Sequence, residues 1–290
     1  MKLKKIAKVL LSCVLSGTLL TACGGEQDAD KTANNLSGDV VKMGVLTHLN
    51  STEESFGEKL SNIEETTSSK APKHLPKFYD SLKLMQIGLE AGDIETISTY
   101  KSVADYLVAN NAKFEIVKHD AINKIQDSFC FAVRKDETQL KNDLDKVIGE
   151  MKSDGSLDKL INDYVTNVDK GQDPPKVELP KFEGVPTIKV GVTGDLPPLD
   201  LILADNSPAG FNTAMLAEIS KRLNRNIEIV QIDTGARAAA LSSKLIDVVF
   251  WVVVPLGKEF PMDIDKPEGL ELSNPYFQDN LALIKLKEDK

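Results

Sequence analysis

Residues 188–192 read IKVGV, and they open the stretch of the sequence that decides the fold. A helical pattern follows at 213–223, the run IEIVQI at 227–232 and the very apolar run VVFWVVV at 248–254. Short apolar runs that alternate with helical segments at this spacing are typical of strand–helix–strand units. The sequence therefore predicts an α/β protein whose central sheets are covered by helices on both faces.

Residues 41–165 follow a similar plan. The patterns there predict strands at 41–46 and 129–133, and helices at 79–90, 102–109, 139–151 and 156–165. The helix at 139–151 is the clearest, because five apolar residues share one of its faces: Leu140, Leu144, Val147, Ile148 and Met151. Residues 60–76 are polar and contain two prolines, so they are predicted to form a surface loop.

Both stretches resemble one protein family. Residues 188–290 contain IKVGVTGDLPPLD, PAGFNTAMLAEISKRLNRNIEIVQID and LSSKLIDVVFW, which resemble the beginning of a family 3 extracellular solute-binding protein. Residues 41–165 contain MGVLTHLNSTEE, LEAGDIETISTYKSVADYL and FCFAVRKDETQLKNDLDKVIGEM, which resemble its end. Such proteins bind polar amino acids for ABC importers. The resemblance implies a type II periplasmic-binding-protein fold, with two lobes, central mixed sheets and the ligand in the cleft between the lobes.

The two stretches stand in the reverse of the family's order, which suggests a circular permutation. This order predicts six parts: a lipoprotein signal peptide at 1–22, a flexible tether at 23–40, lobe two at 41–134, helices completing lobe one at 135–168, a proline-rich linker joining the family's usual termini at 169–187 and the main part of lobe one at 188–290. Permutation is tolerated where the usual termini lie close together at the surface. The alternatives are the tail and head of two tandem domains that assemble only between molecules, and a domain-swapped dimer.

The amino terminus has the pattern of a bacterial lipoprotein. A basic start, MKLKK, precedes an apolar run at 6–20, and Leu-Thr-Ala-Cys follows at 20–23. The apolar run is shorter than the roughly 20 residues that a transmembrane helix needs. The pattern predicts a lipid on Cys23, which would anchor the protein to the bacterial cell membrane on its extracytoplasmic side. The alternatives are an ordinary cleaved signal and an uncleaved helix. Cys130 would then be the only free thiol, so no internal disulfide is predicted.

The composition argues against several classes of protein. The 290 residues carry a formal net charge of −9, which argues against nucleic acid and against adsorption to anionic lipid. The three histidines, His48, His74 and His119, are widely spaced, and the sequence has neither a Walker phosphate loop nor a Gly-x-Ser-x-Gly elbow. The sequence therefore predicts no metal site, no cofactor and no catalytic residue.

The resemblance places a first set of candidate ligand contacts at the turn after the strand at 41–46. Asn50, Ser51 and Thr52 match the family's Gly-Thr turn, whose hydroxyl and amides hold a ligand carboxylate. In open α/β sheets, ligands bind beyond the carboxyl ends of strands and against helix amino termini. The alternative is that these three residues only cap the next helix.

A second set of candidates lies in the predicted lobe one. Asp195 is a candidate partner for a ligand cation. Arg237 is either an anion-binding residue or a solvated arginine at the start of a helix. Trp251, the only tryptophan, is either a stacking wall for an apolar, aromatic or cationic ligand or a core residue of a buried strand.

The residues that hold an α-amino acid in this family are largely missing. The family has an arginine downstream of the aspartate that corresponds to Asp247, and no arginine follows Asp247 here. The family's aspartate for the α-amino group falls at Tyr100, with Glu95 at an earlier acidic position. Both ends of a zwitterion need partners once they are dehydrated, so these departures suggest a different ligand.

We therefore predict a lipid-anchored, non-enzymatic solute-binding protein. It would capture a small polar molecule, an amino acid or a related compound, by closing its lobes, and would deliver it to the membrane permease of an ABC importer. The first alternative is a lipoprotein of the same fold with a protein-interaction or regulatory role. The second is a cleft enzyme of dehydratase type, in which His48 would be the candidate base.

Overall fold

The computed structural model describes residues 40–67, 72–120, 122–168, 171–256, 260, 264–266 and 268–288. All of these lie in one compact unit, Gly38–Lys290. The predicted signal peptide, Cys23 and the tether up to residue 39 lie outside the described residues. Within the described ranges, no helix is both long enough and apolar enough to cross a membrane.

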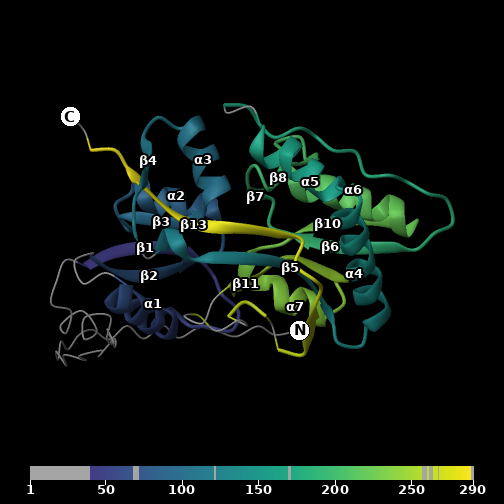
Figure 1. Cartoon of the computed structure of the whole chain (residues 1–290), viewed down its shortest axis with the longest axis horizontal. Helices are drawn as coiled ribbons and strands as arrows, with labels where there is room; N and C mark the ends of the chain where they lie inside the picture. The colour runs from purple at the N-terminus through teal and green to yellow at the C-terminus, as the bar shows by residue number, and fades with distance from the viewer. Residues whose placement is uncertain are drawn as a thin grey trace, which may run out of the picture. The chain divides into compact units, whose positions relative to one another are not determined.

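A 10-stranded mixed sheet runs through this unit (Figure 1). Its main path is β10–β6–β11–β5–β13–β3–β1–β2, with β12 beside β5 and β4 beside β13. The strands are β1 (Val40–Leu46), β2 (Lys73–Tyr79), β3 (Thr96–Tyr100), β4 (Phe114–Val117), β5 (Gln126–Arg134), β6 (Thr187–Val192), β10 (Asn226–Gln231), β11 (Val248–Leu256), β12 (Leu270–Leu272) and β13 (Phe277–Leu286). A small second sheet holds β7 (Asp195–Leu196), β8 (Asp200–Ile202) and β9 (Pro208–Ala209).

Strands β5 and β13 join two halves of the large sheet. β13 pairs with β5 from Phe277 to Asn280 and then with β3 from Leu281 to Ile284. We call the described residues of 40–120 and 281–286 the β1 half, and those of 126–256 and 268–280 the β6 half. The predicted lobe boundaries at residues 134 and 290 stay predictions.

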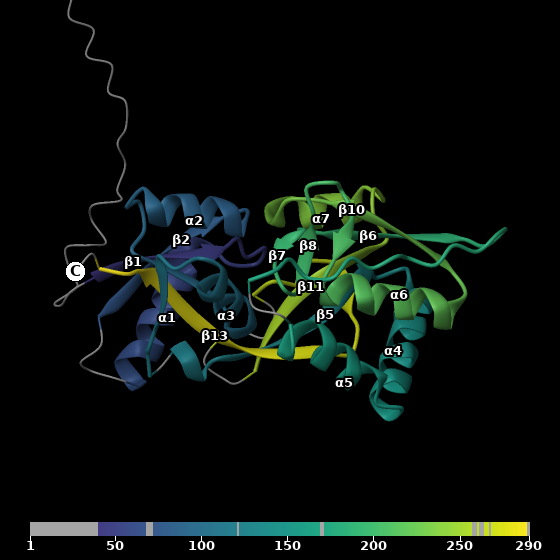
Figure 2. The same cartoon turned by 90° about the horizontal axis from the view of Figure 1, so that it is seen from above.

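Helices cover both faces of the sheet in each half (Figures 1 and 2). In the β1 half, α1 (Glu53–Thr67) packs on one face, and α2 (Leu82–Glu90) and α3 (Lys101–Asn110) pack on the other. In the β6 half, α7 (Arg237–Ser242) covers one face, and α4 (Thr138–Ser153) and α6 (Phe211–Leu223) cover the other, with the short α5 (Ser156–Ile161) against both. The predicted α/β class with central mixed sheets is confirmed.

One expectation from the sequence is wrong: residues 60–76 are not a loop. The helix α1 continues to Thr67, and β2 begins at Lys73. Leu60 and Ile63 bury against β1, being only 2% and 7% exposed, so the apolar face of α1 extends into this polar stretch. Among the described strands, β2 is at the edge of the sheet and pairs only with β1. An edge strand tolerates a proline such as Pro76, so this proline does not indicate a loop here.

Gly44 of β1 lies where no side chain fits. A Cβ atom at this position would lie 2.5 Å from Cδ1 of Ile94 and 3.3 Å from Sδ of Met85. On the opposite face of the strand, Met43 and Val45 are buried against α1. The strand β1 therefore lies between two layers of helices, and Gly44 is on the face that packs against Met85 and Ile94.

Gly44→Ala is expected to lower the free energy of unfolding by about 1–3 kcal/mol, because the added methyl overpacks a full core. Gly149→Ala is the matched control, since no atom of the described residues lies within 4 Å of a Cβ added there in α4. That control is expected to raise the free energy of unfolding by up to about 1 kcal/mol, because alanine is the better helix former. Urea denaturation measures both, and an unchanged or raised stability of Gly44→Ala would contradict the packing described.

Candidate ligand-binding site

Arg237 lies at the junction of the two halves, at the start of α7, and is only 4% exposed. Its guanidinium donates two hydrogen bonds to the carboxylate of Asp265, at 2.7 and 2.9 Å. Nη1 also donates to the carbonyl oxygen of Trp251 at 2.9 Å, and Nη2 lies 3.5 Å from the carbonyl oxygen of Thr47 in the β1 half. Arg237 is thus a buried, paired arginine that contacts both halves, and not a solvated one.

Asp265 is the acidic partner in this junction, and it is 2% exposed. Besides Arg237, its Oδ2 accepts the N–H of Val253 at 3.3 Å. Its Oδ1 lies 4.0 Å from Nδ1 of His48, whose ring stacks on Phe56 with centroids 5.0 Å apart. Burial lowers the pKa of His48, although the charge of Asp265 acts in the opposite direction. A neutral imidazole therefore faces the ion pair at neutral pH.

Side chains and backbone of Phe260, Ile264 and Asp265 pack into the junction. Phe260 stacks on Phe56 with centroids 5.2 Å apart, and the carbonyl oxygen of Ile264 accepts the N–H of Asn50 at 3.0 Å. A cavity of about 50 Å³ lies beside this contact, among the described residues. Its lining includes Val45, His48, Tyr100, Asp127, Phe260 and Leu281. Pockets for small molecules usually measure roughly 300–1,000 Å³, so a ligand would have to take the place of some of these side chains.

Trp251 lies in an irregular part of β11, where the register with β5 shifts between Val249 and Val252. Its φ of 57° falls in the left-handed region, which is uncommon for a residue other than glycine. Its ring stacks with Tyr100 at 6.3 Å between centroids. Its Nε1 is buried and has no hydrogen-bond partner in the part of the chain that the structure describes. Backbone strain and unmet buried donors are concentrated at functional sites.

Asp127 is a second acidic residue at the junction. It lies in β5 and is 5% exposed. Burial raises the pKa of Asp127 to about 7, and the charges of Asp265 and Asp279 act in the same direction. Asp279 accepts hydrogen bonds from the amide and the hydroxyl of Ser102, at 3.0 and 2.6 Å. Asp127 therefore changes its charge near neutral pH.

Several residues singled out from the sequence have other contacts here. Oδ2 of Asp195 accepts the N–H of Leu82 at 2.7 Å, so this carboxylate joins the β6 half to the amino end of α2. Burial raises the pKa of Asp195. The hydroxyl of Thr52 accepts the N–H of Ser55 at 3.2 Å, and the hydroxyl of Ser51 lies 2.9 Å from that of Ser55. Thr52 thus caps α1, whereas Ser51 contacts the hydroxyl of Ser55 and accepts no backbone N–H in these hydrogen bonds.

Glu95 does not join the other candidates. It is exposed, and it accepts the N–H of Lys42 at 3.1 Å, at the end of β3 opposite Tyr100. The structure therefore brings Tyr100, Arg237 and Trp251 together. Asn50 is linked to this group by its backbone hydrogen bond to Ile264, the neighbour of Asp265. Whether any of them contacts a ligand stays a prediction.

Sequence reasoning missed Asp265, Asp127, Phe260 and Ile264 as members of this junction, and it considered His48 only as a base. Asp265 lies in the stretch FPMDIDKPEG, which has no strand or helix pattern. No local signal connects this stretch with Arg237. For Asp127 the sequence holds one clue: this acidic residue lies two positions before the apolar run FCFAV, where a charge is unusual.

Comparison with known families identifies part of the chain. Residues 188–255 match the bacterial extracellular solute-binding proteins, family 3. This segment includes α6, β10 and α7 and most of β6 and β11. It is similar to that family over less than a quarter of the 290 residues. The resemblance predicted from the opening stretch of the sequence is thereby confirmed, and the segment includes Asp195, Arg237 and Trp251. No curated protein matches the chain.

Solved structures of solute-binding and ligand-binding proteins are also similar. The ligand-binding component of an ABC-type import system from Staphylococcus aureus, with zinc bound, matches with 11% identity and a TM-score of 0.41, over 86% of this chain and 66% of that one. The aliphatic sulphonate binding protein SsuA from Escherichia coli matches with 10% identity and a TM-score of 0.37, over 86% and 66%. The GluR0 ligand-binding core from Nostoc punctiforme, in complex with L-glutamate, matches with 11% identity and a TM-score of 0.37, over 86% and 85%. The chain thus spans slightly less than two thirds of the first two.

Proposed function

We propose that this chain is a circularly permuted, lipid-anchored solute-binding protein of the extracytoplasmic side. It would bind a small polar molecule that carries a carboxylate between its halves and deliver it to an ABC importer. The family match of residues 188–255 supports a solute-binding role. The observation that carries the proposal is the buried guanidinium of Arg237, which already holds a carboxylate through two hydrogen bonds at the junction.

The binding step that we propose is an exchange of carboxylates on Arg237. A guanidinium binds a carboxylate in a planar, two-bond geometry, so a ligand carboxylate can replace that of Asp265 without a change at Arg237. Thr47 and His48 approach from the β1 half and Trp251 from the β6 half. A ligand that contacts both sides stabilises the arrangement in which the halves are closed.

Asp265→Asn is the variant that tests this exchange. The whole chain carrying Cys23→Ser would be titrated with amino acids, polyamines, organic acids, aromatic metabolites and short peptides, by thermal shift and calorimetry. We expect a carboxylate-bearing compound to bind the wild type, and to bind Asp265→Asn about 10-fold more tightly or better, because the competing internal carboxylate is gone. The matched control, Asp205→Asn, changes an exposed aspartate that is paired with Lys176, and should bind like the wild type. Equal affinities of Asp265→Asn and the wild type would contradict the exchange.

Membrane attachment is tested separately from ligand binding. Cys23→Ala is expected to move the protein from the membrane fraction to the soluble fraction, because the lipid has no other predicted attachment point. Cys130→Ala is the control, since Cys130 is a free, buried thiol of β5 whose pKa burial raises to about 11. Fractionation of cells that express each variant gives the result, and a Cys23→Ala protein that stays with the membrane would overturn the anchor.

The filled junction favours a second candidate function. Because Arg237 is already paired and the cavity beside it measures about 50 Å³, the fold can also serve as a closed scaffold that binds another protein. Failure of every compound to bind both the wild type and Asp265→Asn would favour this function. Chemical conversion of a bound compound would instead indicate the dehydratase-type enzyme.

A further inference from the structure

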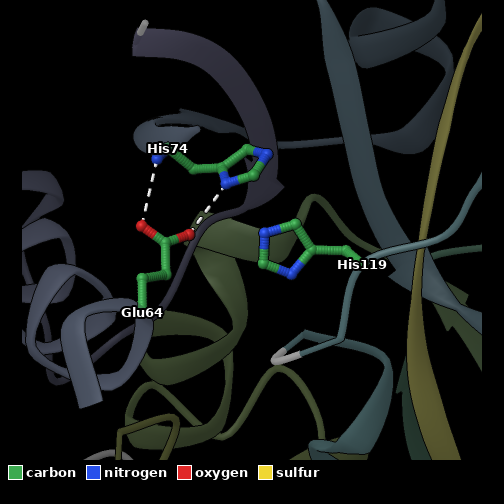
Figure 3. Close-up of side chains that lie close together, drawn as sticks. All are labelled: Glu64, His74 and His119. Atoms are coloured by element: carbon green, nitrogen blue, oxygen red, sulfur yellow. Dashed lines mark hydrogen bonds and ion pairs between the residues drawn. The ribbon is translucent and has the colours of Figure 1, made fainter. Parts of the chain in front are cut away.

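A second cluster of titratable side chains lies at the opposite end of the β1 half. Glu64 of α1, His74 of β2 and His119, which follows β4, lie close together (Figure 3). One potential ligand atom from each lies within 4.8 Å of the others. His74 pairs with Val41 near the amino end of β1, whereas His48 follows the carboxyl end of this strand. The cluster is therefore independent of the junction around Arg237.

All three side chains are buried, with exposures of 2% for Glu64 and 6% for each histidine. The carboxylate of Glu64 lies 2.8 Å from the ring nitrogen Nδ1 of His74. It also accepts a hydrogen bond of 3.2 Å from the backbone N–H of His74. The rings of His74 and His119 meet edge to face, with centroids 5.0 Å apart. The hydrogen bond between Glu64 and His74 gives each of these two buried side chains a partner. It does not explain why the imidazole of His119 lies beside them.

His119 has an unmet polar atom. Its Nδ1 accepts the N–H of Ile122 at 3.1 Å, so the neutral ring carries its proton on Nε2. This Nε2 is buried and, among the described residues, has no hydrogen-bond partner. Figure 3 shows it on the side of the ring that faces Glu64 and His74. A buried polar atom without a partner needs an explanation, and a bound ion is one of the few available.

The geometry points to a binding site for a divalent transition-metal ion of the zinc class. We propose that Glu64, His74 and His119 each supply one ligand. Two nitrogens and one oxygen form a set that suits Zn²⁺, whereas Mg²⁺ and Ca²⁺ are bound by oxygen ligands. A cavity of about 500 Å³ borders His74 and His119, and its lining includes Glu95 and Asp120. This cavity provides an entry path and room for water as the fourth ligand.

Metal binding has a defined consequence for His119. Coordination at Nε2 requires the lone pair of that nitrogen, so the ring proton must move to Nδ1. A protonated Nδ1 cannot accept the N–H of Ile122, and the hydrogen bond between them must break. The sequence predicted no metal site because the histidines are far apart along the chain. The edge strand β2 and the turn at His119 bring them together.

Titration of the metal-free whole chain, carrying Cys23→Ser, with Co²⁺ and Zn²⁺ tests the site. We expect one Co²⁺ per chain with the visible absorption of tetrahedral cobalt, displaced by Zn²⁺. His119→Gln and Glu64→Gln should each weaken binding roughly 100-fold or more, because each removes a ligand. Glu58→Gln, an exposed glutamate on the same helix, should bind as the wild type does.

Two further readouts keep the test decisive. The amide of Ile122 should change its chemical shift on Zn²⁺ addition to the wild type and not to His119→Gln, since only coordination at His119 breaks that hydrogen bond. Circular dichroism of each metal-free variant shows whether it is folded, and Glu64→Gln carries the test if His119→Gln is not. No saturable Co²⁺ or Zn²⁺ binding by the wild type, or undiminished binding by a folded ligand variant, would overturn the proposal.

Discussion

Arg237→Met is expected to lower the free energy of unfolding by about 3–5 kcal/mol, because it leaves a buried carboxylate without its cation. Asp265 is 2% exposed, and its two hydrogen bonds to the guanidinium, at 2.7 and 2.9 Å, disappear in this variant. The carbonyl oxygen of Trp251 also loses its donor. Urea denaturation followed by circular dichroism measures the change, since methionine keeps most of the side-chain volume.

The matched control for Arg237→Met is the double variant Arg237→Met/Asp265→Leu. It removes both charges, and replacement of a buried ion pair by apolar side chains is often neutral, so we expect a free energy of unfolding within about 1–2 kcal/mol of the wild type. The coupling between the two substitutions isolates the ion pair from general packing effects. An Arg237→Met variant as stable as the wild type would show that the Arg237–Asp265 pair does not stabilise the junction.

Asp127→Asn is expected to raise the free energy of unfolding at pH 8 by about 4 kcal/mol, as a pKa shift of roughly three units implies. Burial raises the pKa of Asp127 from 3.8 to about 7. The folded state therefore keeps the proton to higher pH than the unfolded state does. The stability that this protonation contributes is complete below pH 3.8, is lost as the pH rises to about 7, and above that leaves a buried charge. Asparagine carries no such charge.

The pH dependence supplies the control for Asp127→Asn. At pH 5 the aspartate of the folded wild type is protonated, so the difference between the variant and the wild type should be less than half of that at pH 8. Chemical denaturation at both pH values gives the comparison. A difference that does not change with pH, or a variant less stable than the wild type at pH 8, would contradict the buried, shifted carboxyl group.

Much of the fold was predictable where one period of hydrophobicity dominates. The helix predicted at 139–151 lies inside α4, Thr138–Ser153, because its five apolar residues form a single buried face. The strand predicted at 248–254 lies inside β11, Val248–Leu256. Both elements are buried in the core, so burial alone dictates their sequence pattern.

The end of α1 and the strand β2 were not predictable in the same way. Lys73–Tyr79 has a buried histidine and a proline, and among the described strands it lies at the edge of the sheet. Its sequence pattern reflects this edge position and the Glu64–His74 contact. These are tertiary circumstances. Local composition alone therefore predicts a loop for this stretch.

The candidate ligand-binding site was predictable only in part. The sequence predicts Arg237 at a helix start and Trp251 in a buried strand, and both are candidate ligand contacts there. In the structure, Nη1 of Arg237 donates a hydrogen bond of 2.9 Å to the carbonyl oxygen of Trp251. Asp265 was not predictable, since only the folded chain brings it to Arg237. The sequence suggested that the family's usual amino-acid contacts are absent, and the structure adds that an internal carboxylate occupies the arginine that remains.

The most direct test of a ligand site at this junction is a fluorescence titration of Trp251. It is the only tryptophan of the chain, and its carbonyl oxygen accepts a hydrogen bond from Arg237, so its emission reports on this place alone. Our account predicts a saturable change in emission when a carboxylate-bearing compound binds the wild type, and the same change at about 10-fold lower concentration or less in Asp265→Asn. Unchanged emission of both proteins with every compound of the panel would contradict it.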